Sequence, residues 1–152
     1  MGTLSHAKSF RELVAYQKAR ELQREVFRLS AFFPKDELFA LTGQIRRSLR
    51  SIGANIAEAW GKRRYEAHFI SKLTDADSEQ LETQHWVGTA VECGYWTKEL
   101  ATPLVTKSEE VGRLLNGMME KAGLFCGEPN RALRESPPSI LSMSLLRLIT
   151  DC

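Results

Sequence analysis

The sequence is poor in cysteine, and its cysteines form none of the patterns that build a shared site. Cys93, Cys126 and Cys152 are an odd set without a Cys-x-x-Cys pair. This spacing argues against a disulfide framework and against a thiolate zinc site. Because free thiols suit a reducing compartment, we expect a cytoplasmic protein.

Membrane segments and catalytic motifs are also missing from the sequence. No stretch approaches the ~20 apolar residues that a spanning helix requires, and residues 1–9 lack the apolar run of a secretory signal. There is no Gly-rich phosphate loop and no nucleophile elbow. We expect a protein that is not an enzyme, binds no metal or other cofactor and does not contact a membrane.

The small net charge of +2 hides an uneven distribution along the chain. Residues 1–64 contain thirteen Lys or Arg against six Asp or Glu, a net of +7, whereas residues 65–126 contain five against ten, a net of −5. Such a split can hold the two halves of one bundle together, or it can leave a cationic surface for a polyanion. Composition alone leaves both explanations open.

Apolar residues recur at intervals of three and four, and this spacing predicts helices. The first three predicted helices cover residues 9–33, 36–61 and 64–94. Ser9 can cap the first of them, and Pro34 separates it from the second, whose apolar stripe includes Leu38. Gly94 suits a left-handed cap at the end of the third.

The fourth helix is predicted to begin at Pro103, since proline suits a first helical position and Thr102 can cap it. Its apolar stripe runs to Phe125, after which the pattern fails and Pro, Arg and Glu become frequent. Four helices with short connections predict an all-α, antiparallel up-down-up-down four-helix bundle. We assign this domain to residues 1–126 and expect a flexible or loosely docked tail at residues 127–152.

Six cations on the second predicted helix and just beyond it form a candidate nucleic-acid-binding surface. They are Arg46, Arg47, Arg50, Lys62, Arg63 and Arg64. At about 100° per residue, the three within the helix lie roughly opposite its apolar stripe. The first helix adds Arg20, Arg24 and Arg28 at successive fourth positions. Guanidinium groups suit phosphate oxygens, but a solvated face, or pairs with carboxylates of the third helix, would explain the same pattern.

A polar ridge borders the apolar stripe of the second predicted helix. It contains Gln44, Ser48 and Asn55, while Gln80 and Thr83 lie on the core-facing stripe of the third helix. Antiparallel packing would bring the turn from Gln44 to Ser48 near Gln80. Because a buried unpaired amide costs roughly 1 to 3 kcal/mol, we expect hydrogen bonds between these helices. We interpret the five residues as a structural network that fixes helix register or a subunit contact.

One sequence feature is typical of metal enzymes. Glu82 and His85 have the Glu-x-x-His spacing of carboxylate-bridged di-metal bundles. Such a site needs two copies of the motif and two further glutamates, and the sequence has a single copy. Both residues also face away from the apolar stripe of their helix, so we expect an exposed structural pair and no metal site.

Several of these residues resemble a known family. They are Phe33-Pro34, Gln44-x-Arg46-Arg47-Ser48, Ser51-Ile52-x-x-Asn55-Ile56-Ala57-Glu58 and Gly94-Tyr95. The pattern, spread over about residues 9–125, is similar to the small four-helix-bundle proteins encoded by intervening sequences inside large-subunit ribosomal RNA genes. Relatives of that family include the accessory variability determinant of diversity-generating retroelements, a basic pentameric bundle that binds nucleic acid and a reverse transcriptase.

The resemblance implies a left-handed bundle that assembles into a homopentamer and has no established enzymatic activity. We therefore expect an oligomer that gathers several copies of the basic surface, so that weak contacts to RNA or DNA add up. By analogy alone, a reverse transcriptase is a further partner. The alternative is a homo-oligomeric scaffold, or an adaptor for a partner protein, that does not contact nucleic acid.

Overall fold

A computed structural model describes residues 7–127, so the predicted tail, residues 127–152, lies outside the described residues except for Gly127, as do residues 1–6. The long helices are α1 (Val14–Ser30), α2 (Leu41–Gly61), α3 (Glu66–Glu92) and α4 (Lys98–Glu120). Short turns of 3-10 helix, η1 (Phe10–Glu12) and η2 (Lys35–Glu37), precede α1 and α2, and α5 (Ala122–Phe125) follows α4. None of these helices is long and apolar enough to cross a membrane.

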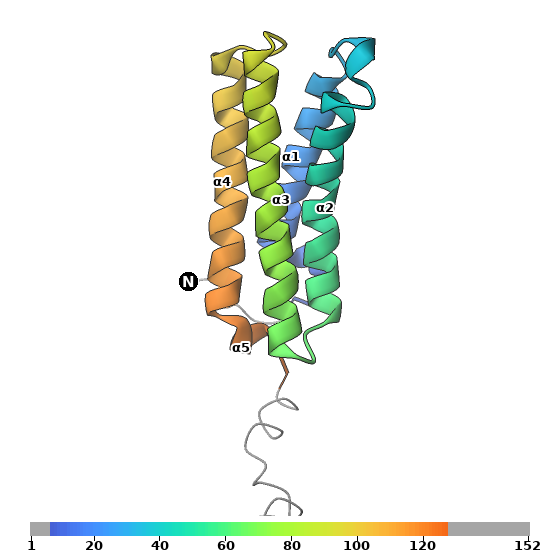
Figure 1. Ribbon diagram of the computed structural model, residues 1–152. Coiled ribbons are helices and arrows are strands. Elements are labelled where there is room, and N and C mark those ends of the chain that lie inside the picture. Colours follow the sequence, from blue (N-terminus) through green and yellow to red (C-terminus); the bar gives the residue numbers. More distant parts are fainter. Residues whose placement is uncertain (1–6, 128–152) are drawn as a thin grey trace, which may run out of the picture.

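The four long helices lie side by side and run alternately up and down (Figure 1). Contacts join α1 to α2, α2 to α3, α3 to α4, and α4 back to α1, so the helices form a closed ring around one core. This arrangement confirms the predicted antiparallel four-helix bundle. The left-handed twist that the family resemblance implies stays a prediction.

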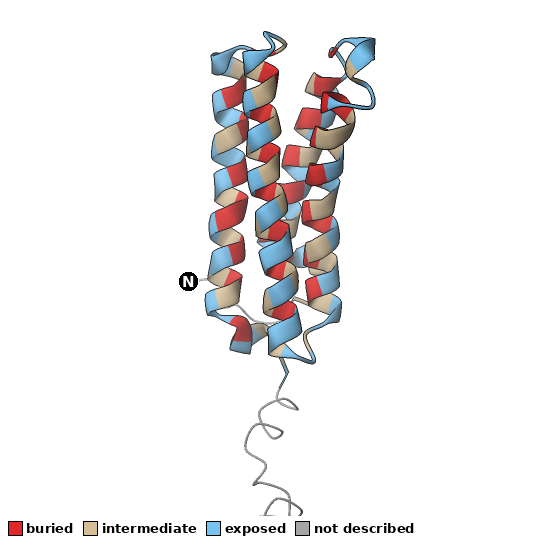
Figure 2. Ribbon diagram, in the orientation of Figure 1, coloured by how far each residue is buried: buried red, intermediate tan, exposed pale blue. Residues whose placement is uncertain are grey.

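One apolar core runs the length of the bundle, and each long helix turns a single buried stripe toward it (Figure 2). Fully buried members include Leu22 of α1, Ile52 of α2, Phe69 of α3 and Leu115 of α4. Burying a side chain of this size contributes about 1.5 to 3 kcal/mol relative to exposure. The spacing of three and four in the sequence is therefore the pattern of the core, and the opposite helix faces are free for charged residues.

The second helix begins later than predicted, because a carboxylate from the preceding turn caps it. Glu37 accepts a hydrogen bond from the backbone nitrogen of Leu41 at 3.1 Å and another from the Tyr95 hydroxyl at 2.9 Å. The expected start at Asp36 is therefore wrong. Leu38, predicted to lie on the core stripe, is 52% exposed.

The fourth helix begins earlier than predicted. Thr97 is its N-cap, and the Thr97 hydroxyl accepts a hydrogen bond from the backbone nitrogen of Leu100 at 3.2 Å. The expected cap at Thr102 is wrong, and Pro103 lies inside α4. Proline has no N–H group, so the carbonyl of Glu99 lacks its usual helical hydrogen bond. Because Glu99 and Pro103 are both exposed, water can bond to that carbonyl instead.

Like α2, the helices α1 and α3 start a little later than the apolar pattern predicts. Ser9 caps η1, where its hydroxyl accepts a hydrogen bond from the backbone nitrogen of Arg11 at 3.3 Å, and α1 begins at Val14. The third helix starts at Glu66. At its end Gly94 has a φ of +75°, which confirms the predicted left-handed cap.

Candidate nucleic-acid interface

Ion pairs join two of the four neighbouring helix pairs in the described part of the chain. Between α2 and α3, Lys72 lies 3.0 Å from Glu58, and Arg47 contacts two glutamates. Between α1 and α4, Lys107 pairs with Glu25 and Lys18 lies 3.9 Å from Glu110. Residues 7–127 contain no ion pair between α1 and α2. The opposite charges of the two halves thus hold the bundle together in part, while the face between α1 and α2 keeps its cations.

Arg47 belongs to the ion pairs and not to the open face. Its guanidinium contacts the Glu82 carboxylate and lies 3.6 Å from that of Glu79. The hydrogen bond to Glu82 raises the pKa of Arg47. Of the alternatives that the sequence left open, pairing with third-helix carboxylates is the one found at this arginine.

Arg46 turns back onto the end of α1. Its Nε donates to the Ser30 hydroxyl at 2.9 Å, and a terminal nitrogen donates to the Phe27 carbonyl at 3.3 Å. The guanidinium carbon lies 4.4 Å from the centroid of the Phe27 ring, a cation–π arrangement. These contacts orient the guanidinium, and no carboxylate within residues 7–127 forms an ion pair with it.

Arg50 faces α1 across a shallow groove. Arg50 and Arg20 line this groove of about 430 Å³ together with Gln23 and Tyr16. The α2 wall is built from the small residues Gly53, Ala54 and Ala57. No carboxylate lines the groove, and within residues 7–127 neither arginine has an ion pair. Two guanidinium groups therefore share an open space without a counterion from this part of the chain.

The three cations that follow α2 are not equivalent. Lys62 is exposed, and the guanidinium of Arg64, also exposed, lies 5.7 Å from the Tyr65 ring. Arg63 instead folds over Trp60, with its guanidinium carbon 3.4 Å from the ring centroid and its Nε 2.8 Å from the Trp60 carbonyl oxygen. Burial lowers the pKa of Arg63. Arg63 is therefore held by packing, while its neighbours are free to meet a ligand.

The predicted polar network exists only in part. The hydroxyls of Ser48 and Thr83 lie 2.9 Å apart in the core between α2 and α3. The bond between the two helices that the sequence predicts for the turn from Gln44 to Ser48 is thus made by Ser48, whereas Gln44 accepts a hydrogen bond from the Nε of Arg47, 3.3 Å away on its own helix. The side chain of Asn55 makes no hydrogen bond within the described range.

Gln80 faces α4, where the sequence had suggested no partner. Its side-chain oxygen accepts from the Ser108 hydroxyl at 3.0 Å, and its amide nitrogen donates to Asp77 at 3.1 Å. A Cβ atom at Gly112 would lie only 2.8 Å from that nitrogen. Ser108 and Gly112 thus belong to the network, although they were not predicted from the sequence. The one sign of them in the sequence is that a polar residue and a glycine interrupt the apolar stripe of α4.

Glu82 of the single Glu-x-x-His motif takes part in the ion pairs between α2 and α3. Glu82 accepts a hydrogen bond from the indole nitrogen of Trp86 at 3.0 Å, and exposed His85 packs edge-on against the same ring. No group of three or more metal-binding side chains occurs among residues 7–127. This arrangement orients Glu82 toward Arg47.

Glu79 and Glu82 should respond in opposite ways when each is replaced by glutamine. Burial raises the pKa of Glu79, whose Oε2 atom is buried without a hydrogen-bond partner in the described residues. The hydrogen bond from Trp86 lowers the pKa of Glu82. Glu79→Gln should therefore leave the free energy of unfolding unchanged or raise it at pH 7, whereas Glu82→Gln should lower it by about 1 kcal/mol.

The stability loss of Glu82→Gln should depend on pH, because the pKa of Glu82 is lowered in the folded protein. Because the pKa of Glu82 is depressed in the folded state, its stabilisation is present above the unfolded value of about 4.3 and disappears as the pH falls through the folded value. Urea denaturation at pH 7 and at pH 3 measures this, and the deficit of Glu82→Gln should shrink at pH 3. Equal losses for the two variants at pH 7 would contradict the assignment.

Comparison with known proteins identifies the family to which the chain belongs. Residues 11–117 match the family described as 23S rRNA-intervening sequence protein. A solved structure of a protein with unknown function from the S23 ribosomal protein family of Bacteroides thetaiotaomicron is similar, with a TM-score of 0.64 and 32% sequence identity over 70% of this chain and 96% of that chain. No curated protein matches the chain, and neither of these descriptions names an enzymatic activity. The chain therefore belongs to the family of 23S rRNA-intervening sequence proteins.

Proposed function

We propose that the protein binds nucleic-acid phosphates through the basic face, which we define as Arg20 and Arg24 of α1 with Arg46 and Arg50 of α2. The groove between the two helices carries the proposal, because Arg20 and Arg50 line one open space that has no carboxylate. The family name refers to intervening sequences of 23S ribosomal RNA, which makes structured RNA the first ligand to test. The assignment replaces the predicted surface in part, since Arg47 and Arg63 are engaged elsewhere. Lys62 and Arg64 follow the end of α2 and do not line this groove, so the basic face does not include them.

The spacing of these arginines suits a backbone that passes over both helices. Residues four apart on a helix lie about 6 Å apart along its axis, so each helix presents a short row of two cations. Each guanidinium offers a planar fork of donors to phosphate oxygens. The small residues on the α2 wall let a strand approach closely. Such contacts position a nucleic acid without reading its sequence, so we expect affinity without strong sequence preference.

Binding should depend steeply on salt, because neutralised phosphates release their counterions. We expect measurable binding of the full chain to a structured ribosomal RNA hairpin at low ionic strength, with an affinity that falls as salt is raised. Fluorescence anisotropy with labelled hairpin, titrated at several salt concentrations, measures both. A lack of affinity at low salt, or an affinity that salt does not change, refutes the proposal.

Self-association is favoured by a separate observation at the connection between α1 and α2. Phe32 and Phe39 are 88% and 93% exposed there, and aromatic residues are enriched at protein–protein interfaces relative to the rest of the surface. A homo-oligomer would cover these rings and bring several basic faces together, which raises the affinity for a long polyanion. A homo-oligomeric scaffold without a nucleic-acid ligand is thus the second candidate function. The pentameric state, the kinship with the accessory variability determinant and the reverse transcriptase partner stay predictions.

Replacing both exposed rings should shift the chain toward the monomer. We expect Phe32→Ser with Phe39→Ser to lower the molar mass measured by multi-angle light scattering, while the helical circular dichroism is unchanged because neither side chain is in the core. Leu81→Ser is the matched control, since Leu81 is an exposed apolar residue on α3. An unchanged molar mass would show that subunits meet elsewhere or not at all.

A further inference from the structure

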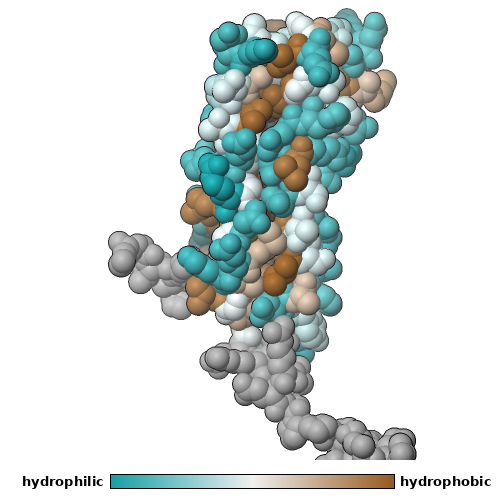
Figure 3. All heavy atoms as spheres, turned by 60° about the vertical axis from the view of Figure 1, so that its left-hand side comes forward, coloured by the Kyte–Doolittle hydropathy of each residue, from teal (hydrophilic) through white to brown (hydrophobic). Residues whose placement is uncertain are grey.

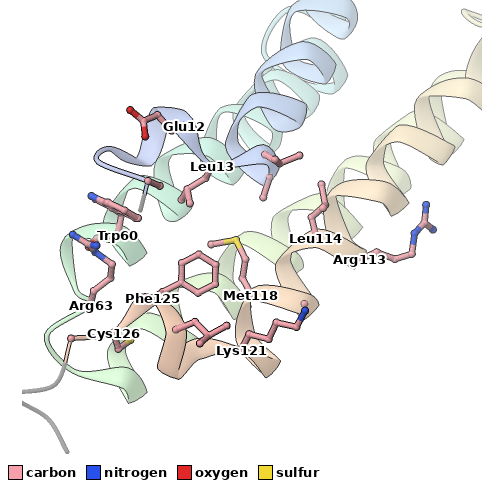
Figure 4. Close-up of a pocket in the computed structure, with 16 residues that line it drawn as sticks. Glu12, Leu13, Trp60, Arg63, Arg113, Leu114, Met118, Lys121, Phe125 and Cys126 are labelled. Atoms are coloured by element: carbon pink, nitrogen blue, oxygen red, sulfur yellow. The ribbon is translucent and has the colours of Figure 1, made fainter. Parts of the chain in front are cut away.

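A larger open groove of about 900 Å³ lies at the end of the bundle where α1 begins and α4 ends. We call it the end groove. Most of its large apolar lining residues come from the start of α1, the last turns of α4, and α5, and these include Leu13, Val14, Leu114, Met118, Leu124 and Phe125. The end of α2 adds Trp60, and charged side chains, among them Glu12 and Lys121, also line the groove. In Figure 4 the side chains of Leu13, Met118 and Phe125 point toward one another across this space, whereas Arg113 points away from it.

The end groove leaves apolar side chains uncovered. Val14 is 54% exposed and Leu124 is 67% exposed, and both lie on its wall. On the face seen in Figure 3, hydrophobic residues are interspersed with hydrophilic ones along the whole length of the bundle, its lower end included. An uncovered apolar surface that is concave is the usual mark of a docking site for an apolar segment.

The same chain contains a segment that matches this lining. Residues 140–149 are apolar at most positions and carry a single charge, that of Arg147. The chain also leaves the described range beside the groove, because Gly127 itself lines it. The connection, residues 128–139, can span about 40 Å when extended, and the whole of α4 is about 35 Å long. The connection is therefore long enough for residues 140–149 to return to the groove.

We propose that residues 140–149 dock in the end groove of their own chain. A short tether gives the segment a millimolar effective concentration at the groove, so even weak apolar contacts would keep the site filled. Docking would cover Val14 and Leu124 and would also enclose Arg63, whose guanidinium already packs over Trp60 at the groove edge. The proposal is independent of nucleic-acid binding, because none of the arginines of the basic face lines the end groove.

Charges placed in the tail test the docking without touching the bundle. In the full chain, Leu145→Asp with Leu148→Asp should expel the segment, and the control Ser142→Asp with Ser144→Asp adds the same charge without removing apolar side chains. We expect the leucine variant to raise the fluorescence of 8-anilinonaphthalene-1-sulfonate at least threefold and to speed amide hydrogen exchange of residues 114–125 and 140–149 at least tenfold. The serine variant should change neither.

A further variant tests whether the dye binds in the same groove that residues 140–149 leave. Adding Leu124→Lys, an exposed position that should not disturb folding, is expected to remove the extra dye signal of the leucine variant. Equal dye fluorescence and equal exchange in the unmodified chain and the leucine variant would overturn the proposal. Protection of residues 140–149 that disappears when the protein is diluted would also overturn it, because the segment would then occupy the groove of a second copy.

Discussion

Arg20→Glu combined with Arg50→Glu should weaken binding to the structured RNA hairpin by about 100-fold at low salt. Both arginines line the acid-free groove between α1 and α2, so the double change replaces two phosphate donors with two groups that repel phosphate. Removing two phosphate contacts should also make the plot of log affinity against log salt shallower by about two. Anisotropy titrations of the variant and the unmodified chain measure both effects.

The control must change the net charge by the same amount on another face. Lys98→Glu with Arg113→Glu does so, because both residues are exposed on α4 and have no ion pair within residues 7–127. We expect this pair to reduce affinity only slightly, through the long-range field. Equal losses in the two double variants would mean that binding reflects net charge and that the basic face has no special role.

The second large effect is expected at a glycine of α4. Gly112→Ala should lower the free energy of unfolding by about 2 to 3 kcal/mol, because the new Cβ would lie 2.8 Å from the Gln80 amide nitrogen and 3.2 Å from Asp77. Gln80 cannot simply move aside, since its oxygen accepts hydrogen bonds from Ser108 and Gln84 in a buried position. Urea denaturation of the variant gives the loss.

A double-mutant cycle separates this clash from the ordinary effect of alanine in a helix. When Gln80→Ala is added, the amide is gone, so Gly112→Ala should cost much less than it does alone. Gly117→Ala in the same helix is the control, because nothing beyond its chain neighbours and the adjacent helix backbone lies within 4 Å of its added Cβ, and it should stabilise by up to about 1 kcal/mol. If the two changes at positions 80 and 112 are additive, the amide is not the obstacle.

Most of the fold could be predicted from the sequence because it depends on local periodicity. Ile45, Ile52 and Ile56 lie on one stripe at any α-helical geometry, and four such stripes have to meet in one core. The start of α2 could not be predicted, because its cap is a carboxylate held from outside the helix. Glu37 is fixed by Tyr95, a contact between residues far apart in the sequence.

The candidate site was harder to predict, since it depends on which neighbour each polar side chain meets. Arg47 and Arg50 point in directions that differ by only about 60° around α2. This difference is enough for Arg47 to contact the glutamates of α3 and for Arg50 to line the groove beside α1. Gln80 lies on the core stripe, and Ser108 together with the missing Cβ of Gly112 directs it to α4. None of these choices follows from the spacing along a single helix.

Chemical modification of arginines in the presence and absence of RNA tests the central claim most directly. Phenylglyoxal reacts with accessible guanidinium groups, and mass spectrometry reports the extent of reaction at each residue. Saturating hairpin RNA at low salt should protect Arg20 and Arg50 at least fivefold and leave Arg113 unchanged. If Arg113 is protected while Arg20 and Arg50 react as fast as in the free protein, the α1–α2 face is not the nucleic-acid interface.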